Sequence, residues 1–541
     1  MGKSISRMTL TLIILTSLSM LAFSQDQEAE RFTKRIENIA EEYYRIGDYE
    51  KALEGYLMLD SINPENTEYN YRIGICYFNT STSSLAYPYL EFAYQQDDAP
   101  EGIMYELARA YHFGMEFEKA IIMYESYKKQ IQFLKPDNKS DEINEAQIDH
   151  FIQQCRNGIA MVRDPFLNTS IKNLGPQINS EYDDFAPLLN KNEDLLIFTS
   201  KRKATSNTKS DPLTGQYYEN ILIAQLSNGK WTKAASIGEA INQDNIHNSA
   251  VGMSPSGELL FIYEGDGDRF SSRISGDLFM SIGQEGQWGE PVKIDAINSR
   301  SWESSATISE DGSILVISSN RQGGYGGTDL YISGKGPDGQ WTTPENMGAY
   351  INTRYDEDGP FIHPDGNKLY FSSKGHSSMG GYDIFYTEYQ EDKKRWGRPV
   401  NMGFPINSAA DDVYFVWSAD GERAYFSSQR ADTYGNTDIY MLTREDTRSV
   451  MVNATGEVRD KIDDNPVIAE LIVRDELNND LIGIFTTDEK MGTYSISLAA
   501  GRKYRIAIEA QGYRNEDFLL NITQKTDPAD IVKNVTLTRR Q

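Results

Sequence analysis

The chain has 541 residues, which is too long for one hydrophobic core and predicts three or four domains. Its formal net charge of −27 disfavours charge-driven binding of nucleic acid or anionic lipid, and favours basic partners or divalent cations. The solubility of an exported protein would also account for this charge. The two cysteines, Cys76 and Cys155, are too few for a disulfide scaffold, and we expect both to be buried thiols in helices.

Residues 1–24 have the pattern of a secretory signal peptide. A charged stretch with Lys3 and Arg7 precedes an apolar run over residues 8–23 that ends in small residues. The run is short for a membrane-spanning anchor, which is the alternative interpretation. No cysteine follows the run, which argues against a lipid-modified N-terminus. We therefore expect an exported chain that begins near Gln25 and inserts no segment directly into a membrane.

Residues 29–165 are expected to form helical repeats. Ala52, Ala86 and Ala120 recur at a step of 34 residues, the period of tetratricopeptide repeats. Other small and aromatic positions keep the same step: Ala40, Gly74 and Ala108; Tyr43, Tyr77 and Tyr111; Tyr56, Leu90 and Tyr124. The sequence therefore predicts stacked helix pairs, with a last helix near residues 142–162 that closes the array.

Residues 168–446 carry a longer repeat. Each unit has a turn, an apolar strand that ends in small hydroxyl residues, a Gly-rich loop and an acid-plus-strand element such as Asp329-Leu330-Tyr331. The turns are Asn192-Glu193, Ser256-Gly257, Asp311-Gly312, Asp365-Gly366 and Asp420-Gly421, and their last three steps are 55, 54 and 55 residues. Four short strands in a unit of this length predict a β-propeller blade, which needs neighbours to bury its faces. We expect five blades, with six as the alternative.

The ends of this ring are expected to meet in one sheet. Four units continue through a tryptophan to an outer strand and an Ile-Asn pair, but nothing of this kind follows Tyr440 in the fifth unit. A matching piece, residues 171–175 followed by Ile178-Asn179, precedes the first unit. We therefore predict that this piece pairs with the sheet that contains Tyr440.

Residues 449–541 alternate apolar and polar side chains at period two, with turn signals at residues 463–466, 478–480 and 500–501. This pattern predicts a small antiparallel β-sandwich. Taken together, the patterns predict a multidomain protein with one α and two all-β domains: a tetratricopeptide α-solenoid, a five-bladed β-propeller and the sandwich.

Two of these regions resemble known families. The central repeats resemble the TolB-type, WD40-like propeller repeats of exported bacterial proteins, through His363-Pro364-Asp365-Gly366, Ser428-Gln429-Arg430 and residues 380–385. The last region resembles a carboxypeptidase regulatory-like domain through Gly456-Glu457-Val458 and residues 492–498. Nothing in it resembles the metal-binding catalytic half of a peptidase, so this resemblance implies no peptidase activity.

The three regions in this order resemble the periplasmic PorE-type proteins of Bacteroidetes. That resemblance implies a periplasmic scaffold associated with the outer membrane, with peptidoglycan and with type IX secretion. Those proteins usually continue into an OmpA-like peptidoglycan-binding domain, whereas this sequence ends at Gln541. We therefore expect a partner, such as an outer-membrane barrel or an OmpA-like anchor, to hold the protein at the envelope.

One position just before each innermost propeller strand is polar in all five units. It holds Asp184, Asn248, Glu303, Glu357 and Asp412. At one mouth of the central channel these side chains would bind a cation such as Ca²⁺ or a basic segment of a partner. The alternative is structural, because Arg202, Arg321 and Arg430 lie on loops that open on the same face and would pair with the acids.

The helical repeats carry a candidate groove for a protein partner. The positions that face the concave side are rich in aromatic residues and include two basic groups: Tyr71, Ile75, Phe78, Tyr105, Arg109, His112 and Phe113. Such a surface suits an extended or helical peptide. Packing of this groove against the propeller or the last helix is the alternative.

The sequence shows no catalytic constellation. Its five histidines have no metal-ligand spacing, and no Gly-x-Ser-x-Gly elbow occurs. The Gly-rich loops lie within hairpins and lack the helix that a phosphate-binding loop opens. We therefore expect a non-catalytic interaction scaffold with no cofactor other than Ca²⁺ at the channel mouth. The alternative is a propeller that binds or acts on glycans or peptidoglycan, because acid pairs are abundant.

Overall fold

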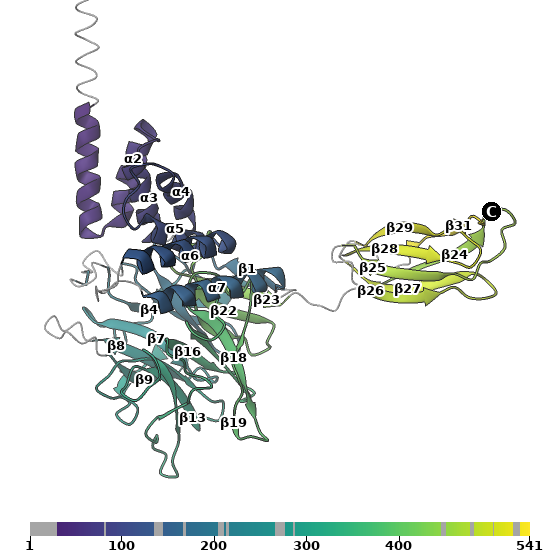
Figure 1. The fold of residues 1–541 in the computed structure, drawn as a ribbon. Helices are drawn as coiled ribbons and strands as arrows, with labels where there is room; N and C mark the ends of the chain where they lie inside the picture. The colour runs from purple at the N-terminus through teal and green to yellow at the C-terminus, as the bar shows by residue number, and fades with distance from the viewer. Residues whose placement is uncertain are drawn as a thin grey trace, which may run out of the picture. The chain divides into compact units, whose positions relative to one another are not determined.

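The computed structural model describes residues 30–80, 83–134, 144–165, 169–203, 210–211, 216–265, 276–284, 287–444, 451–476, 481–500, 502–522 and 531–540. The predicted signal peptide lies outside the described residues. The chain divides between Thr443 and Arg444 into two compact units. The first contains the helices and five sheets, and the second is a small β-domain (Figure 1).

Within the described parts of the chain, no helix combines the length and the apolar character needed to cross a bilayer.

The first unit begins with the helices. After a helix over residues 30–46 come α2 (Tyr49–Ile62), α3 (Thr67–Phe78), the 3₁₀ turn η1 (Ser83–Leu85), α4 (Ala86–Tyr94), α5 (Ile103–Phe113), α6 (Phe117–Leu134) and α7 (Glu145–Arg163). Asp48 and Asn66 cap α2 and α3 by accepting backbone N–H bonds, and Asn144 forms a capping box with Gln147 at the start of α7. In Figure 1, α6 and α7 are the helices nearest the sheets.

The residues that set the 34-residue period lie where helices touch. Ala52, Ala86 and Ala120 are fully buried. A Cβ atom added to Gly74 in α3 would lie 2.4 Å from the Cγ atom of Leu90 in α4, so only glycine permits this approach. Cys76 and Cys155 are buried free thiols in α3 and α7, which confirms that prediction.

Residues 169–444 form five antiparallel sheets, numbered here in chain order. Sheet 1 has β2 (Asp184–Leu189), β3 (Leu195–Ser200), β4 (Asn220–Ser227), β5 (Lys230–Trp231) and β6 (Ala235–Ser236). Sheet 2 has β7 (His247–Met253), β8 (Leu259–Gly265), β9 (Gly276–Gln284), β10 (Gln287–Trp288) and β11 (Val292–Lys293). Sheet 3 has β12 (Glu303–Ile308), β13 (Ile314–Ser319), β14 (Asp329–Gly334) and β15 (Glu345–Asn346).

Sheet 4 has β16 (Glu357–Ile362), β17 (Lys368–Ser373), β18 (Asp383–Gln390), β19 (Arg395–Trp396) and β20 (Val400–Asn401). Sheet 5 has β21 (Asp412–Trp417), β22 (Arg423–Ser428) and β23 (Asp438–Arg444), and its fourth strand is β1 (Thr169–Asn173). The first strands of successive sheets are neighbours from β2 through β7, β12 and β16 to β21, and β21 lies beside β2. The five sheets therefore form a closed, propeller-like ring.

The ring closes where β1 pairs with β23, which confirms the pairing predicted for residues 171–175. A buried asparagine clamps this closure. The Oδ1 atom of Asn179 accepts a bond from the Ile439 amide at 2.9 Å, and its Nδ2 donates to the Ile439 carbonyl at 3.0 Å. The same two bonds occur within the other four sheets, from Asn242, Asn298, Asn352 and Asn407.

The hydroxyl residues that end the second strands join neighbouring sheets. The Thr199 hydroxyl accepts a bond from the Ala250 amide in β7 at 2.9 Å, and the Ser427 hydroxyl accepts one from the Ala186 amide in β2 at 3.0 Å. Both amides lie at bulges of the innermost strands, where a backbone group needs a partner outside its own ladder.

The second unit packs two sheets around one apolar core. Its strands are β24 (Met451–Asp460), β25 (Glu470–Asp475), β26 (Leu481–Thr486), β27 (Thr493–Ala499), β28 (Arg502–Glu509), β29 (Glu516–Ile522), β30 (Ile531–Val532) and β31 (Val535–Leu537). The sheet β26-β25-β28-β29 is antiparallel, as predicted. In the other sheet, β30 and β31 run parallel to β24, so the expectation of an entirely antiparallel sandwich is wrong there. The last segment of the chain returns beside β24 in the same direction.

Candidate partner-binding cleft

The five polar residues, which lie at the starts of the innermost strands, are all fully buried. Three of the four acids pair with the arginine of their own sheet, and Asn248 donates to the backbone carbonyls of Gln243 and Ile246. The nitrogen-to-oxygen distances of the ion pairs are 2.5 Å for Arg202 and Asp184, 3.0 Å for Arg321 and Glu303, and 3.2 Å for Arg430 and Asp412. These three acids therefore form ion pairs within their own sheets, as the structural interpretation predicts.

Glu357 is the exception among the four acids, because its sheet has Gly375 at the position where the sheets of the other three acids have an arginine. Its carboxyl accepts bonds from the backbone amide of Thr353 at 2.8 Å, the hydroxyl of Thr353 at 2.6 Å and the hydroxyl of Ser373 at 2.8 Å. Burial raises the pKa of Glu357 to about 7. The side chain is thus partly protonated near neutral pH.

The expectation that these residues line an open channel mouth is wrong. Because Asp184, Asn248, Glu303, Glu357 and Asp412 are inaccessible to solvent, neither Ca²⁺ nor a basic partner segment reaches them in this structure. Among the residues that the structure describes, no group of three His, Cys, Asp or Glu side chains is placed to hold a metal ion.

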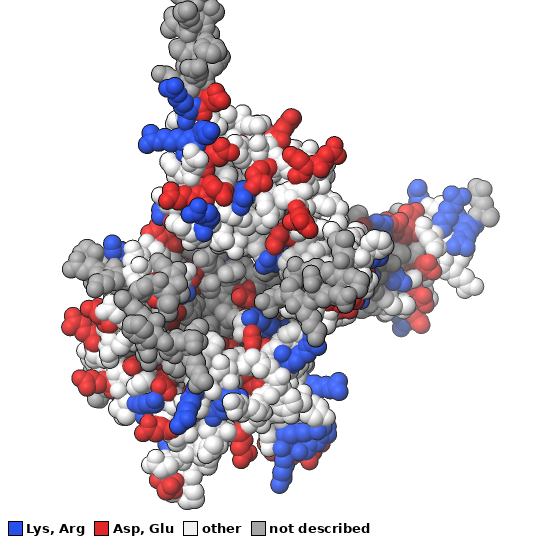
Figure 2. Space-filling model, turned by 60° about the vertical axis from the view of Figure 1, so that its left-hand side comes forward, with Lys and Arg blue, Asp and Glu red and all other residues white. Residues whose placement is uncertain are grey.

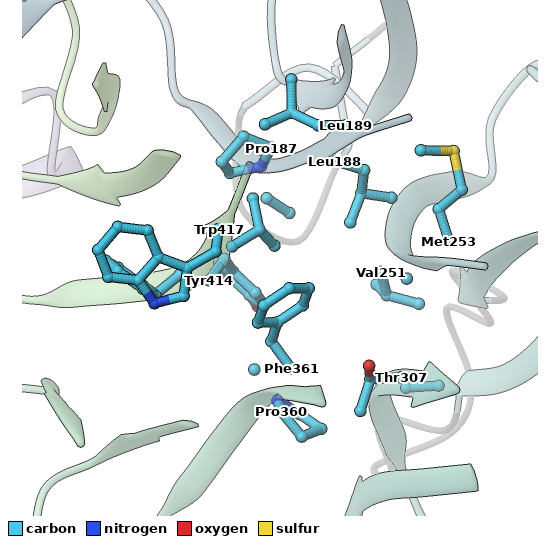
Figure 3. A pocket seen from close by; sticks show the side chains of 16 residues that line it. Pro187, Leu188, Leu189, Val251, Met253, Thr307, Pro360, Phe361, Tyr414 and Trp417 are labelled. Atoms are coloured by element: carbon cyan, nitrogen blue, oxygen red, sulfur yellow. The ribbon is translucent and has the colours of Figure 1, made fainter. Parts of the chain in front are cut away.

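The ring axis is narrow and apolar at the other ends of the innermost strands. Figure 3 shows side chains from β2, β7, β12, β16 and β21 converging there, among them Pro187, Met253, Thr307, Phe361 and Trp417. The cavity between them measures about 50 Å³, well below the range of about 300–1,000 Å³ that is typical of ligand sites. This end of the axis is therefore too small for a drug-sized ligand.

The concave side of the helices docks on the Gly-rich loop of sheet 4. His112 in α5 is buried, and its Nε2 atom lies 2.8 Å from the Met379 carbonyl oxygen. Gln154 and Asn157 in α7 donate to further backbone carbonyls of residues 378–380. The Met379 side chain is fully buried in the helical core. At His112 the predicted groove therefore packs against the propeller, which was the alternative interpretation of these residues.

Burial lowers the pKa of both histidines at this contact. The pKa of His112 falls to about 4, because the charged imidazolium is disfavoured where water is excluded. His150 in α7 stacks on Tyr355 with ring centroids 4.0 Å apart, and burial lowers its pKa as well. Both rings are neutral at pH 7, so His112 donates from Nε2 without placing a charge in the interface.

Beside this contact, the helices and the rim of the ring enclose a cleft made of two hollows. One hollow of about 340 Å³ lies next to the loop of sheet 4 and is lined by Tyr105 and Tyr355 among others. The second, of about 360 Å³, lies between α3 and α5 on one side and sheets 1 and 5 on the other. Arg109 and Phe113 line both hollows, so the two are adjoining parts of one cleft.

The helical side of the cleft is aromatic and contains one anchored cation. Phe78 and Phe113 meet edge to face with ring centroids 5.2 Å apart. The guanidinium of Arg109 lies over the Phe78 ring, 4.0 Å from its centroid, and bonds to Glu106 at 3.1 Å. These contacts fix the aromatic surface that faces the ring.

In the hollow of about 360 Å³, the propeller side of the cleft contributes two acids. Asp183 lines it and pairs with Lys201 at 3.2 Å. Asp411 lines it as well and accepts a bond from the Tyr382 amide at 2.8 Å. In the described part of the chain, no lysine or arginine lies within ion-pair distance of Asp411. The aromatic wall of the cleft thus faces two acids in this hollow, and it faces Tyr355 and Lys374 in the other.

Five of the seven predicted groove residues line the cleft: Phe78, Tyr105, Arg109, His112 and Phe113. His112 also contacts the propeller loop. The other two are Ile75, which is buried in the helical core, and Tyr71, which packs against that core.

Sequence reasoning missed the residues that hold the helices on the ring. Met379 occupies the loop position that Tyr325 and Tyr434 hold in sheets 3 and 5, where these tyrosines are 53% and 51% exposed. An apolar residue that replaces an exposed tyrosine in a repeat was a usable signal. The polar residues Gln154 and Asn157 share one face of α7 with His150, which was a second signal.

No family model matches this chain, and no curated protein matches it in sequence. Among solved structures, it is similar to TolB from Agrobacterium tumefaciens, at 16% identity over 61% of this chain and 88% of that chain, with a TM-score of 0.30. It is also similar to the first TPR domain of human RPAP3, at 15% identity over 25% of this chain and 97% of that domain, with a TM-score of 0.19. An α-L-arabinofuranosidase from Lactobacillus brevis matches at 14% identity, over 50% and 91% of the two chains, with a TM-score of 0.34.

The neighbours thus include a TolB-like protein and a tetratricopeptide domain, two of the classes that the sequence repeats resemble. At these scores none of the likenesses supports a statement about function.

Proposed function

We propose that this chain is a non-catalytic interaction scaffold of the cell envelope. In this proposal the five sheets are the blades of a five-bladed propeller, and the helices are a tetratricopeptide solenoid fixed on one of its faces. The observation that carries the proposal is the cleft of two adjoining hollows, in one of which the aromatic side chains of α3 and α5 face two acids of the propeller, Asp183 and Asp411.

The dimensions and composition of the cleft suit a peptide segment of a partner protein. Each hollow falls within the range of about 300–1,000 Å³ that is typical of ligand sites. Aromatic and arginine side chains, which dominate the binding energy of protein interfaces, line the helical side. The contact at Met379 fixes both walls before a partner arrives, so binding orders few additional groups.

The proposed location is the periplasm, at the outer membrane through a partner. It rests on the signal-peptide pattern and on the resemblance to PorE-type proteins. We propose an outer-membrane barrel or an OmpA-like anchor as that partner, with secretion or gliding as the process served. The second unit would act as a further docking module.

A glycan-binding or glycan-active propeller has no specific observation in its favour. The two acids that motivate it, Glu357 and Asp412, are fully buried, and the axial cavity holds about 50 Å³. An extended sugar chain therefore finds no open pair of carboxylates at these positions.

The proposal is tested by recovery of partners from envelope extracts on the immobilised intact protein. The double variant Phe113→Ala with Arg109→Ala should release the partner, because both side chains line both hollows. Phe133→Ala is the matched control, since Phe133 on α6 is 89% exposed. If the double variant keeps the melting temperature of the wild type and the partner still binds to it, the cleft is not the binding site.

A further inference from the structure

Comparison of the five sheets singles out one end of the cleft. The residue just before the buried polar position is Asp183 in sheet 1 and Asp356 in sheet 4. Each pairs with a lysine that follows the second strand of its sheet, at 3.2 Å for Lys201 and 3.0 Å for Lys374. An acid at this rim position is thus matched by an internal lysine.

Sheet 5 keeps the acid but has lost the lysine. Asp411 occupies the rim position, and the residue at the lysine position is Gln429. The Oδ1 atom of Asp411 accepts a bond from the Tyr382 amide, just as the Oδ1 atom of Asp356 accepts one from the preceding loop. The two carboxylates are therefore held alike, and Asp411 lacks only the cation.

In the two remaining sheets, acid and lysine are absent together. Sheet 2 has His247 and Gly265 at these positions, and sheet 3 has Trp302 and Asn320. Sheet 5 is therefore the one sheet that retains the acid without its lysine, and together with sheet 1 it borders the hollow of about 360 Å³.

The surroundings of Asp411 in this hollow favour a cation on an apolar stem. Asp411 and Gln429 line the hollow from the ring, and Phe78 and Phe113 line it from the helices. Arg109 also lines it, but its guanidinium is held over Phe78 and bonded to Glu106, and it makes no ion pair with Asp411.

We propose that this end of the cleft binds a lysine side chain of the partner segment, whose ammonium group takes the place of the internal lysine of sheets 1 and 4. The inference rests on the proposed function of the cleft. The ammonium group would donate to the Asp411 carboxylate and to the amide oxygen of Gln429, while the methylene stem packs on Phe78 and Phe113. The net charge of −27 also favours a basic segment in a close encounter.

Display of random peptides against the immobilised intact protein tests this inference. The expected binders share one lysine next to an apolar or aromatic residue. In a synthetic binder, replacement of that lysine by norleucine should lower the affinity about tenfold or more, because one charge-assisted bond is lost. Gln429→Lys should lower the affinity by a similar factor, since it supplies the cation internally and leaves Asp411 in place.

Gln429→Met is the matched control, because it has a similar length and no charge, and it should lower the affinity by less than Gln429→Lys does. Binders that lose affinity on Phe113→Ala but contain no lysine would overturn the lysine inference and leave the proposed function standing. An affinity that is unchanged by Gln429→Lys would likewise overturn the lysine inference and leave the proposed function standing. A library that yields no binder sensitive to Phe113→Ala would overturn both proposals.

Discussion

A single asparagine clamps the third strand of each sheet in the ring, and at the ring closure this residue, Asn179, is buried. Its amide group satisfies both the N–H and the C=O of one residue in that strand, so two buried polar groups depend on one side chain. Asn179 makes these bonds to Ile439, about 260 positions later in the chain. At the residue scale, the ring is therefore closed by the same pair of hydrogen bonds that occurs within each of the other sheets, and here the pair joins the first and last segments of the ring.

Asn179→Ala should destabilise the protein as much as Asn407→Ala, the equivalent change within sheet 4. Each change removes the two hydrogen bonds to the strand and a third to the side chain of Asn173 or Asn401, at about 1 kcal/mol each, so we expect a loss of about 3 kcal/mol. Urea unfolding of both variants measures this loss. If Asn179→Ala lowers the free energy of unfolding by less than about 0.5 kcal/mol while Asn407→Ala shows the expected loss, then Asn179 does not hold the two ends of the ring together.

Glu357→Gln should stabilise the protein at alkaline pH. Burial raises the folded-state pKa of Glu357 from 4.5 to about 7, so the unfolded chain releases its proton first. The stability that this side chain contributes is full below pH 4.5 and is lost as the pH rises through 7.

Relative to the wild type, the Glu357→Gln variant should gain about 3 kcal/mol between those two pH values, at 1.36 kcal/mol per unit of pKa. Urea unfolding across this pH range measures the gain. Parallel stability curves for the two proteins would mean that Glu357 ionises as easily in the fold as in the unfolded chain.

At the scale of elements, the loop of sheet 4 joins the helices to the ring. The loops of sheets 3, 4 and 5 are built alike, because Asp329, Asp383 and Asp438 each accept a backbone amide bond from the loop position that Met379 holds in sheet 4. The residue presented at this position is a tyrosine in sheets 3 and 5, whereas in sheet 4 it is an apolar side chain that enters the helical core.

Met379→Ala should therefore destabilise the protein by about 2 kcal/mol or more, because it leaves a cavity in a packed core. Tyr325→Ala changes the equivalent position of sheet 3, where the side chain is 53% exposed, and should cost less than about 0.5 kcal/mol. Thermal unfolding of the two variants measures this difference. Equal costs would contradict the docking of the helices through this loop.

Acid should weaken the same contact. Burial lowers the pKa of His112 from its ordinary 6.5 to about 4, so the stability from its neutral ring is full above pH 6.5 and is lost as the pH falls towards 4. The loss amounts to about 3 kcal/mol, at 1.36 kcal/mol per unit of pKa.

His112→Gln removes the titrating group and keeps a donor for the Met379 carbonyl. The stability advantage of the wild type over this variant should shrink by that amount between pH 7 and pH 4, as measured by urea unfolding. An advantage that is constant with pH would show that His112 carries no proton-linked contribution.

The sequence predicts elements where a physical constraint is repeated. The step from Ala52 to Ala86 and Ala120 marks helix contacts, and the Ile-Asn pairs mark clamps, because each unit of a repeat needs the same side chain at the same place. The closing strand before Ile178-Asn179 is predictable for the same reason. A contact that occurs once leaves no such pattern, which is why the docking of His112 on Met379 was left open.

Access to a side chain is harder to predict than its position. The five polar residues before the innermost strands were located correctly along the chain, but their burial depends on the arginines and hydroxyls that fold over them. In the second unit, the parallel pairing of β30 and β31 depends on the path of a loop rather than on the alternation of apolar residues.

At the scale of the first unit, the helices and the ring form the two walls of the cleft that we propose as the binding site. On the face shown in Figure 2, acidic side chains are spread over the surface with basic ones among them, in keeping with the net charge of −27. A net charge of this size favours solubility, and the aromatic side chains of the cleft are the surface that we propose a partner binds.

The most direct test of this account replaces Phe113 with a photoactivatable aromatic residue, with the same replacement at Phe133 as the control. Irradiation in the native envelope should then link a defined partner protein through position 113 in the cleft and leave position 133 unlinked. A partner that is linked equally at both positions, or at position 133 alone, would contradict the account.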